Sequence, residues 1–507
     1  MNRCGFTIYD MIVRNARLYP EQCAVVYGDR RISFSAYQDL CDRCAAGLAG
    51  EGIKVGDRIA LLAANNDDFM VLCGAAAKTG AVIVSVNYRL SEAEAEYVFK
   101  DTSPKYLFTS GEYKDQARRS ASAAGSVRRH FVFKADEQED EFLPFGTLLS
   151  KATVTRQNAI PDNHPYMIIH TAAVGGKPRG CTLSQTNLLA VALQISEMFK
   201  LTASDCYLGA LPLFHIGGFS MTLAAMLQGG KNLIMDRFDP SLILTLAETE
   251  KGTFFVTFPP MLGAILDAQE KHAVGMKSLR FAAGIDGPDT IRRFLKNNPR
   301  AAFHGLYGQT EAMPVSSCDV REKPGSVGRP ALMTRVAIFD DSDCEVEAGV
   351  QGEICVRSPA VFLGYWNLPA DTAYTFRNGW HHTGDRGHVD KDGFLFYGGR
   401  KPEKELIKPG GENVYPAEVE KTILSHVSVE EVCVIGVPDP EWGEAVKAVC
   451  VLTKGMEMTA EELIDFVAGK IARYKKPKHV LFVSSLPKTA GGEINRTEVK
   501  KLYSGKS

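Results

Sequence analysis

The sequence has 507 residues, more than one hydrophobic core usually holds, so we expect about two to four domains or subdomains. Its 45% hydrophobic and 23% charged residues are typical of a globular protein, and a net charge of -2 without a basic block argues against nucleic acid as the main partner. Of twelve cysteines, only Cys41 and Cys44 form a CxxC pair; no second pair accompanies them, so reduced thiols are favoured over a metal site.

The first three hundred residues alternate between helical patterns and short apolar runs. Ser35 can cap a helix that ends near Gly50 and Gly52. Apolar runs follow at RIALLAAN, AVIVSV and KYLFTS, and again at KNLIMD, GTFFVTF and SLRFAAG. Runs that are apolar on both faces and separated by helices predict a mainly parallel sheet covered on both sides.

One uncharged stretch, Cys206 to Gly230, is long enough to span a bilayer. Pro212, His215 and two glycines interrupt it, which favours a buried strand, a loop and a buried helix. The first residues also lack the apolar core of a signal peptide. We therefore expect a cytoplasmic protein without a membrane span.

The C-terminal part has a different pattern of predicted secondary structure. From about Val327 short strands and turns (RVAIFD, GEICVRS, GFLFYGGR) predict a small β-rich unit, and RKPEKELIK reads as a linker. Pro416 then begins a helix, two strands follow, Thr459 caps a second helix, and HVLFVSSLP is a final strand. This order is typical of a small α+β domain.

The glycine-rich segment HTAAVGGKPRG, residues 170–180, has two interpretations. Its glycines can expose backbone N–H groups as an anion nest, with Lys177 and Arg179 adding positive charge, or they can form a tight turn. The segment alone does not separate them. No metal-ligand cluster with regular spacing and no complete nucleophile elbow is apparent in the sequence.

Six segments match the motifs of one family in order: Thr171–Gly180, LPLFHIGG at Leu211–Gly218, YGQTE at Tyr307–Glu311, GSVGRP at Gly325–Pro330, GWHHTGD at Gly379–Asp385, and Arg400 with GGENVYPAEVE at Gly410–Glu420. The chain thus resembles the acyl-CoA synthetases of the adenylate-forming superfamily nearly end to end. The resemblance implies an α/β N-terminal region, 1–399, with two stacked, mainly parallel sheets and a β-rich subdomain at about 327–399. It further implies a hinge at 400–409 and a mobile α+β C-terminal domain at 410–507.

Enzymes of this family let a carboxylate attack the α-phosphorus of ATP, and CoA then displaces AMP from the acyl-adenylate. The resemblance implies that Thr310 contacts the α-phosphate, Glu311 holds Mg²⁺, and His215 borders the carboxylate and gates the acyl tunnel. It assigns nucleotide and CoA contacts to a larger set: Thr171, Gly175, Gly176, Lys177, Arg179, Gly284, Ile285, Asp286, Tyr307, Gly308, Gln309, Thr310, Asp385, Arg400, Gly410 and Gly411. Within it, Tyr307 stacks on adenine opposite Gly284 to Asp286. The resemblance also implies that Asp385 accepts the ribose hydroxyls.

The same residues have plainer interpretations when taken singly. Tyr307 fits a core position, Asp385 a turn and Thr310 a helix cap, and His215 fits a buried histidine with its bonds satisfied. The ordered set of motifs favours the site.

Two departures from the family pattern stand out. Ala172, Ala173 and Val174 replace hydroxyl or glycine positions of the phosphate loop, and Arg179 replaces a lysine, which predicts a weaker grip on phosphate. Glu493, in PKTAGGEINR, stands where the family has the lysine that serves adenylation. The resemblance also places the hinge at Lys404.

The prediction from sequence is an ATP-dependent acid–CoA ligase that uses ATP, Mg²⁺ and coenzyme A on a fatty, alicyclic or aromatic acid, with a reduced adenylation rate. Its expected partners are small molecules, and the sequence leaves a homo-oligomer open. Two alternatives remain. One is an adenylate-forming enzyme with another acyl acceptor. The other is a non-catalytic relative that binds nucleotide or acyl-CoA, which Glu493 favours.

Overall fold

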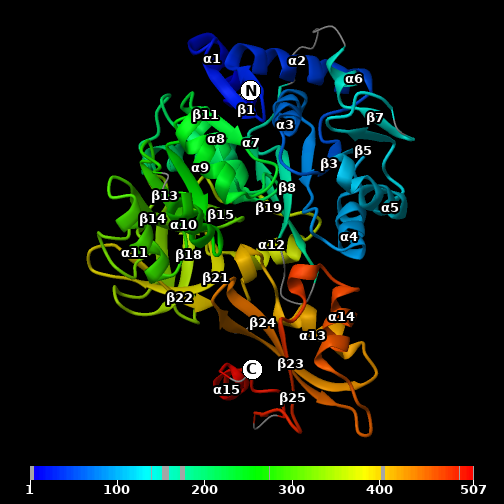
Figure 1. The fold of residues 1–507 in the computed structure, drawn as a ribbon, viewed down its shortest axis with the longest axis vertical. Helices are drawn as coiled ribbons and strands as arrows, with labels where there is room; N and C mark the ends of the chain where they lie inside the picture. The colour runs from blue at the N-terminus through cyan, green and yellow to red at the C-terminus, as the bar shows by residue number, and fades with distance from the viewer. Residues whose placement is uncertain are drawn as a thin grey trace.

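The computed structural model describes residues 5–138, 140–150, 159–171, 177–272, 275–400, 406–489 and 492–505. They form a large body with three β-sheets and a small lobe (residues 406–505) with a fourth (Figure 1). The N-terminal helices lie at the end of the body away from the small lobe, which carries the C-terminus (Figure 1).

Two mainly parallel sheets organise the body. The nine-stranded sheet has the order β16 (Arg329–Pro330), β15 (Ala312–Asp319), β14 (Ala302–Gln309), β13 (Phe281–Gly284), β12 (Phe254–Thr257), β10 (Cys206–Gly209), β11 (Lys231–Ile234), β1 (Cys23–Tyr27), β2 (Arg30–Ser33). The eight-stranded sheet has the order β19 (Gly364–Tyr365), β9 (Arg179–Ser184), β8 (Pro165–Thr171), β4 (Val82–Ser85), β3 (Arg58–Leu62), β5 (Tyr106–Thr109), β6 (Arg129–Val132), β7 (Phe142–Pro144). The apolar runs singled out in the sequence are buried strands of these two sheets, three in each, as expected for parallel sheets covered on both faces.

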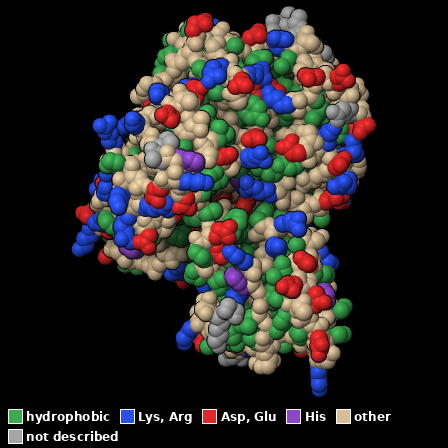
Figure 2. Space-filling model, in the orientation of Figure 1, with side chains coloured by type: hydrophobic (Ala, Val, Ile, Leu, Met, Phe, Trp, Pro, Cys, Tyr) green, Lys and Arg blue, Asp and Glu red, His purple; other side chains and the backbone are tan. Residues whose placement is uncertain are grey.

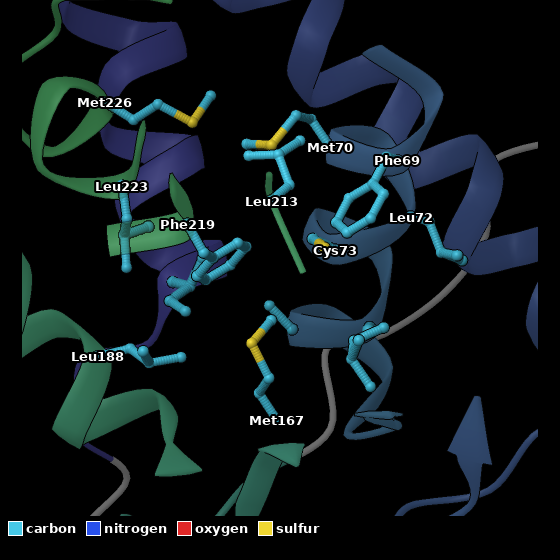
Figure 3. Close-up of a cluster of buried hydrophobic side chains, with 14 of the residues drawn as sticks. Phe69, Met70, Leu72, Cys73, Met167, Leu188, Leu213, Phe219, Leu223 and Met226 are labelled. Carbon is cyan, nitrogen blue, oxygen red and sulfur yellow. The ribbon is translucent and has the colours of Figure 1, made fainter. Parts of the chain in front are cut away.

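Helices fill the space between the two sheets and cover their outer faces. The shared core contains side chains of α1 (Ile8–Leu18), α2 (Phe34–Gly50), α3 (Asp67–Thr79), α7 (Gln185–Met198) and α8 (Ile216–Leu227), several of which Figure 3 shows. The nine-stranded sheet packs outside against α9 (Pro240–Thr249), α10 (Met261–His272) and α11 (Pro288–Asn297). The eight-stranded sheet packs outside against α4 (Glu92–Thr102) and α5 (Lys114–Ala124). The short helix α6 (Gly146–Leu149) packs against α2.

The uncharged stretch from Cys206 to Gly230 lies inside this core. It forms β10, a loop and the buried helix α8, as the interrupting Pro212 and glycines predicted. Among the described residues no helix has both the length and the apolar character to cross a bilayer.

A third sheet carries the β-rich unit expected from Val327 onward. It contains β17 (Arg335–Phe339), β18 (Gly352–Arg357), β20 (Phe376–Arg377), β21 (Trp380–Val389) and β22 (Leu395–Arg400), with α12 (Pro369–Thr375) beside it. Strand β21 pairs with β22 so that Asp385 lies opposite Arg400.

The small lobe follows the helix–strand–strand–helix–strand order expected from the sequence. Its elements are α13 (Pro416–Leu424), β23 (Val429–Asp439), β24 (Gly443–Leu452), α14 (Ala460–Ala468), β25 (His479–Phe482) and α15 (Arg496–Tyr503). Thr459 caps α14, as expected, and exchanges bonds with Glu462 in a capping box. The predicted fold class is confirmed, whereas the exact domain boundaries remain a prediction.

The cap of the second helix was predicted at the wrong serine. Ser33, and not Ser35, is the N-cap of α2, because its hydroxyl accepts a hydrogen bond from the backbone N–H of Ala36 at 3.2 Å. Both CxxC cysteines, Cys41 and Cys44, point into the core from this helix. Among the cysteines that the structure describes, Cys344 is the exposed one, Cys23 is half-buried and the others are buried.

Candidate active site

Four residues from three motifs, Tyr307 and Gln309 with Asp385 and Arg400, converge at the carboxyl end of β14. Asp385 is only 1% exposed; its Oδ2 accepts hydrogen bonds from the Tyr307 hydroxyl at 2.7 Å and from the Gln309 amide at 2.5 Å. Its Oδ1 lies 3.1 Å from Nε of Arg400 but accepts no hydrogen bond within the described structure. Because a buried carboxylate oxygen rarely stays unbonded, Oδ1 is suited to accept a ligand hydroxyl.

The wall beside this cluster comes from the end of β13. Gly284 lies opposite Gly305 of β14, so the residues after Gly284 reach the level of Tyr307. Gly284 has a φ of 141°, and a Cβ there would lie 2.0 Å from the carbonyl oxygen of Thr257, so only glycine fits. Beyond it, Ile285 is 49% exposed and Asp286 is half-buried. The geometry thus brings together the two walls expected to enclose adenine.

Glu311 lies just beyond β14, after Gly308 and a turn that contains Thr310. It is buried, and its Oε1 accepts hydrogen bonds from the Tyr365 hydroxyl at 3.0 Å and the Thr171 hydroxyl at 3.3 Å. A carboxylate with a hydroxyl oxygen beside it is a donor set that suits Mg²⁺.

The phosphate loop is described only at its two ends. Gly175 and Gly176 lie outside the described residues, while Lys177 is exposed. Arg179 points its guanidinium over the ring of Tyr365, 4.1 Å from the centroid, and pairs with Asp371 at 3.3 Å. Contact of this loop with phosphate remains a prediction.

His215 precedes α8 and contacts the small lobe. Its Nε2 lies 3.5 Å from Oε1 of Glu412, which is also ion-paired with Arg89. Burial would raise the pKa of Glu412, but the charges of His215 and Arg89 outweigh it and lower the pKa to about 2. The carboxylate therefore ties the loop after Gly411 to the body.

The paired glycines of this loop pass close to aromatic side chains. A Cβ on Gly410 would lie 2.6 Å from the ring of Trp442, and one on Gly411 would lie 3.2 Å from Phe258. Both glycines have positive φ angles. A chain segment without side chains thus lies between the body and the small lobe, where a side chain would collide with Trp442 or crowd Phe258.

A buried ion-pair triad forms a second contact between the small lobe and the body. The Lys475 side chain is 3% exposed and pairs with Glu94 of α4 and, at 2.7 Å, with Glu418 of α13. The backbone N–H of Ala472 also donates to Glu94 at 3.0 Å. Burial would lower the pKa of Lys475, but the charges of Glu94 and Glu418 outweigh it and raise it. Charged side chains accordingly gather around the junction of the two parts (Figure 2).

Glu493 does not join the cluster. It is exposed and lies just before α15, which Figure 1 shows on the side of the small lobe away from the body. The two cations near it in sequence are engaged: Lys488 contacts Glu431 at 2.5 Å, and Arg496 contacts Glu420 at 2.6 Å. The expected hinge residue, Lys404, lies outside the described residues.

The structure also brings together a group that the sequence spacing did not suggest. Glu353, Cys355 and His382, from β18 and β21, place potential metal-ligating atoms within 4.8 Å of one another. The guanidinium of Arg377 lies 2.9 Å from Nδ1 of His382 and 3.7 Å from Glu353. A cation is therefore already present in this cluster, which accounts for its charge without a metal ion.

Sequence reasoning missed Arg89, Glu94, Tyr365, Glu412 and Lys475. Each acts through a partner far away in the chain, for example 323 residues for Arg89 and Glu412. Of these five residues, only Glu412 could have been singled out from the sequence, because it stands inside the GGEN motif.

Comparisons with known proteins agree with this geometry. The family described as AMP-binding enzyme matches residues 12–366, and the AMP-binding enzyme C-terminal domain matches residues 418–493. An indoleacetate–CoA ligase of Aromatoleum aromaticum is 32% identical over 98% of this chain and 98% of its own. A feruloyl-CoA synthase of an Amycolatopsis species is 34% identical over 97% of this chain and 98% of its own.

One solved relative, the o-succinylbenzoate CoA synthetase of Bacillus subtilis, is known in several complexes. A double mutant bound with a product analogue matches with a TM-score of 0.85 at 27% identity over 97% of both chains. The complex with the acyl-adenylate intermediate matches with a TM-score of 0.70 at 28% identity over 97% of both chains. Our structure is thus more similar overall to the product-analogue complex.

The chain belongs to the AMP-binding enzyme family. The resemblance to acyl-CoA synthetases is confirmed, and the protein is an enzyme of the acid–CoA ligase class, whose members use ATP and CoA.

Proposed function

We propose that this protein joins a bulky apolar carboxylic acid, of which an aryl acid is the first candidate, to CoA through an acyl-adenylate. The observation that carries the proposal is the docking of Gly410, Gly411 and Glu412 onto His215 and Phe258, beside the cluster of Tyr307 and Asp385. A thiol that enters past the glycines would arrive next to the nucleotide cluster.

In this proposal each part of the site has one task. Asp385 accepts a ribose hydroxyl at Oδ1, and Tyr307 with the Gly284 wall encloses adenine. Glu311 and Thr171 hold Mg²⁺, which when bound would neutralise charge on the phosphates. Thr310 contacts the α-phosphate. The likeness to the product-analogue complex supports the interpretation that the lobe is docked for thioester formation.

The proposal of an aryl or otherwise bulky acid rests on the surroundings of His215 and on the relatives. His215 packs against Phe214 at 4.4 Å between ring centroids, and the exposed side chain beside Gly284 is the apolar Ile285. Two relatives named for indoleacetate and for ferulate extend along nearly the whole chain.

Thioester formation from ATP, CoA and a panel of acids tests this function. We expect indoleacetate or ferulate to exceed dodecanoate, and acetate to give no product. Product from acetate alone would contradict the bulky apolar substrate. Pyrophosphate release without a CoA thioester would instead indicate another acyl acceptor.

A second candidate is a chain that binds nucleotide and acyl-CoA but hardly adenylates. It is favoured by the exposed Glu493 and by the engagement of Lys488 and Arg496 with carboxylates. Turnover of a chemically prepared acyl-adenylate, with no product from ATP and free acid, would support it.

A further inference from the structure

Glu311 is held from two directions by one short segment of the chain. The backbone N–H of Phe362 donates to the Glu311 carbonyl at 2.9 Å, and the Tyr365 hydroxyl donates to the carboxylate Oε1 at 3.0 Å. Backbone and carboxylate are therefore both fixed by residues 362–365, outside the motifs noted in the sequence. The two hydrogen bonds that Oε1 accepts, from Tyr365 and Thr171, restrict the rotation of the carboxylate.

Tyr365 is itself firmly placed. It lies on β19 opposite Cys181 of β9, and its backbone N–H donates to the Thr372 hydroxyl at 2.9 Å. Its hydroxyl donates to the Glu311 carboxylate at 3.0 Å, so Tyr365 is held both at its backbone and at the tip of its ring.

Arg179 holds the other side of the same ring. Its guanidinium lies 4.1 Å from the ring centroid, and the pair with Asp371, 3.3 Å away on α12, keeps it there. A planar guanidinium can stack on the ring and pair with a carboxylate at once, which an ammonium does less well. Contacts within the protein, with Tyr365 and Asp371, therefore explain why an arginine suits this position.

We propose that Tyr365 is a positioning residue for the Glu311 carboxylate as it receives a divalent cation, and that Arg179 acts on Glu311 through Tyr365. The inference rests on the proposed function, in which Glu311 holds Mg²⁺. It differs from the expectation that Arg179 grips phosphate directly. Partners that orient a ligating carboxylate commonly contribute about 10–100-fold to metal affinity.

Binding of Mn²⁺, followed by its electron paramagnetic resonance signal, tests this with the full chain and α,β-methylene ATP. For Tyr365→Phe we expect Mn²⁺ affinity to fall at least tenfold while AMP affinity without metal, measured by calorimetry, is unchanged. Arg179→Lys should shift Mn²⁺ affinity in the same direction by a smaller factor. Tyr374→Phe is the matched control, since Tyr374 is 63% exposed on the neighbouring helix α12.

Unchanged Mn²⁺ affinity in a folded Tyr365→Phe variant, or no Mn²⁺ binding by the wild type, would overturn the proposal. Equal loss of AMP and Mn²⁺ binding would also overturn it, because it would indicate damage to the whole site. If Tyr365→Phe does not fold, Arg179→Lys decides, and unchanged Mn²⁺ affinity there counts against the proposal. The titration needs no turnover. A wild type that binds Mn²⁺ yet makes no thioester would thus refute the proposed function separately.

Discussion

Replacement of Glu94 by glutamine should slow thioester formation and leave adenylation unchanged. Glu94 is the body's contribution to the buried triad, where it accepts bonds from Lys475 and from the backbone N–H of Ala472. We expect the small lobe to present a different face to the body during adenylation, and these partners would then be elsewhere. Glu94→Gln therefore weakens the present orientation selectively.

The magnitude follows from what the substitution removes. Breaking a buried ion pair costs about 3–5 kcal/mol, but Lys475 keeps Glu418 as a partner, so we expect about 2–3 kcal/mol. At 1.36 kcal/mol per tenfold, this corresponds to an equilibrium constant for docking lowered roughly 30–150-fold, which is the upper limit of the fall in the docked population. Helix α4 should persist, because the amide oxygen of glutamine can replace Glu94 as acceptor from the Ser91 backbone N–H.

Rapid-quench kinetics separate the two steps. Pyrophosphate formation with ATP and acid should match the wild type, whereas CoA transfer from preformed acyl-adenylate should fall by the factor above. Glu92→Gln is the control. The Glu92 side chain is 51% exposed and pairs with Arg119, and the loss of such an exposed ion pair costs less than about 1 kcal/mol of stability. Equal slowing of both steps, or none, would refute the assignment of the triad to one orientation.

Four other outcomes are expected. Asp385→Ala should abolish tight AMP binding in calorimetry without unfolding the protein, because the ribose loses a charge-assisted acceptor worth ~1.5–3 kcal/mol per bond; unchanged affinity would remove Asp385 from the ribose role. Lys404→Pro should slow thioester formation more than adenylation, because proline fixes one φ angle of the expected hinge. Equal slowing of both steps would show that Lys404 is not the hinge residue. Glu493→Lys should speed single-turnover adenylation at least tenfold, because one positioned donor is commonly worth ~10²–10³ in rate. No gain, together with loss of adenylation in Lys488→Ala, would instead assign the charge to Lys488. Because the pKa of Glu412 is lowered to about 2, the negative charge that Glu412 contributes to docking should be lost as pH falls from the ordinary value of 4.5 towards 2. Scattering that shows the lobe equally docked at both ends of this range would contradict this sign.

The sequence predicted local structure well wherever one short pattern determines it. Buried strands such as β4 and β12 are apolar runs, and Thr459 caps α14 because a capping box needs only four residues. Ser33 and Ser35 both lie at the start of the same helix, and composition did not distinguish them; the backbone angles of Ser33 identify it as the N-cap.

The candidate site was predicted only where a motif carries it. Tyr307, Gln309, Asp385 and Arg400 lie together because the ends of β14 and β22 meet the middle of β21, and each stands in a recognisable segment. Tyr365 reaches Glu311 only through the pairing of β19 with β9, which no local pattern encodes. The docking contacts depend on the orientation of the small lobe, which is a property of the whole molecule.

The burial of the cysteines has a practical consequence for following the small lobe in motion. Thiol reagents attack the thiolate, and burial raises the pKa of the core cysteines, for example Cys206 and Cys450, to about 12. Among the described cysteines only Cys344, in the body, is exposed. In a Cys4→Ser background a dye at Cys344 and a second at a cysteine introduced for Val427, which is 78% exposed on the small lobe, would form a nearly native distance reporter. Cys344 thus supplies one of the two labelling sites that a single-molecule fluorescence measurement of this distance needs.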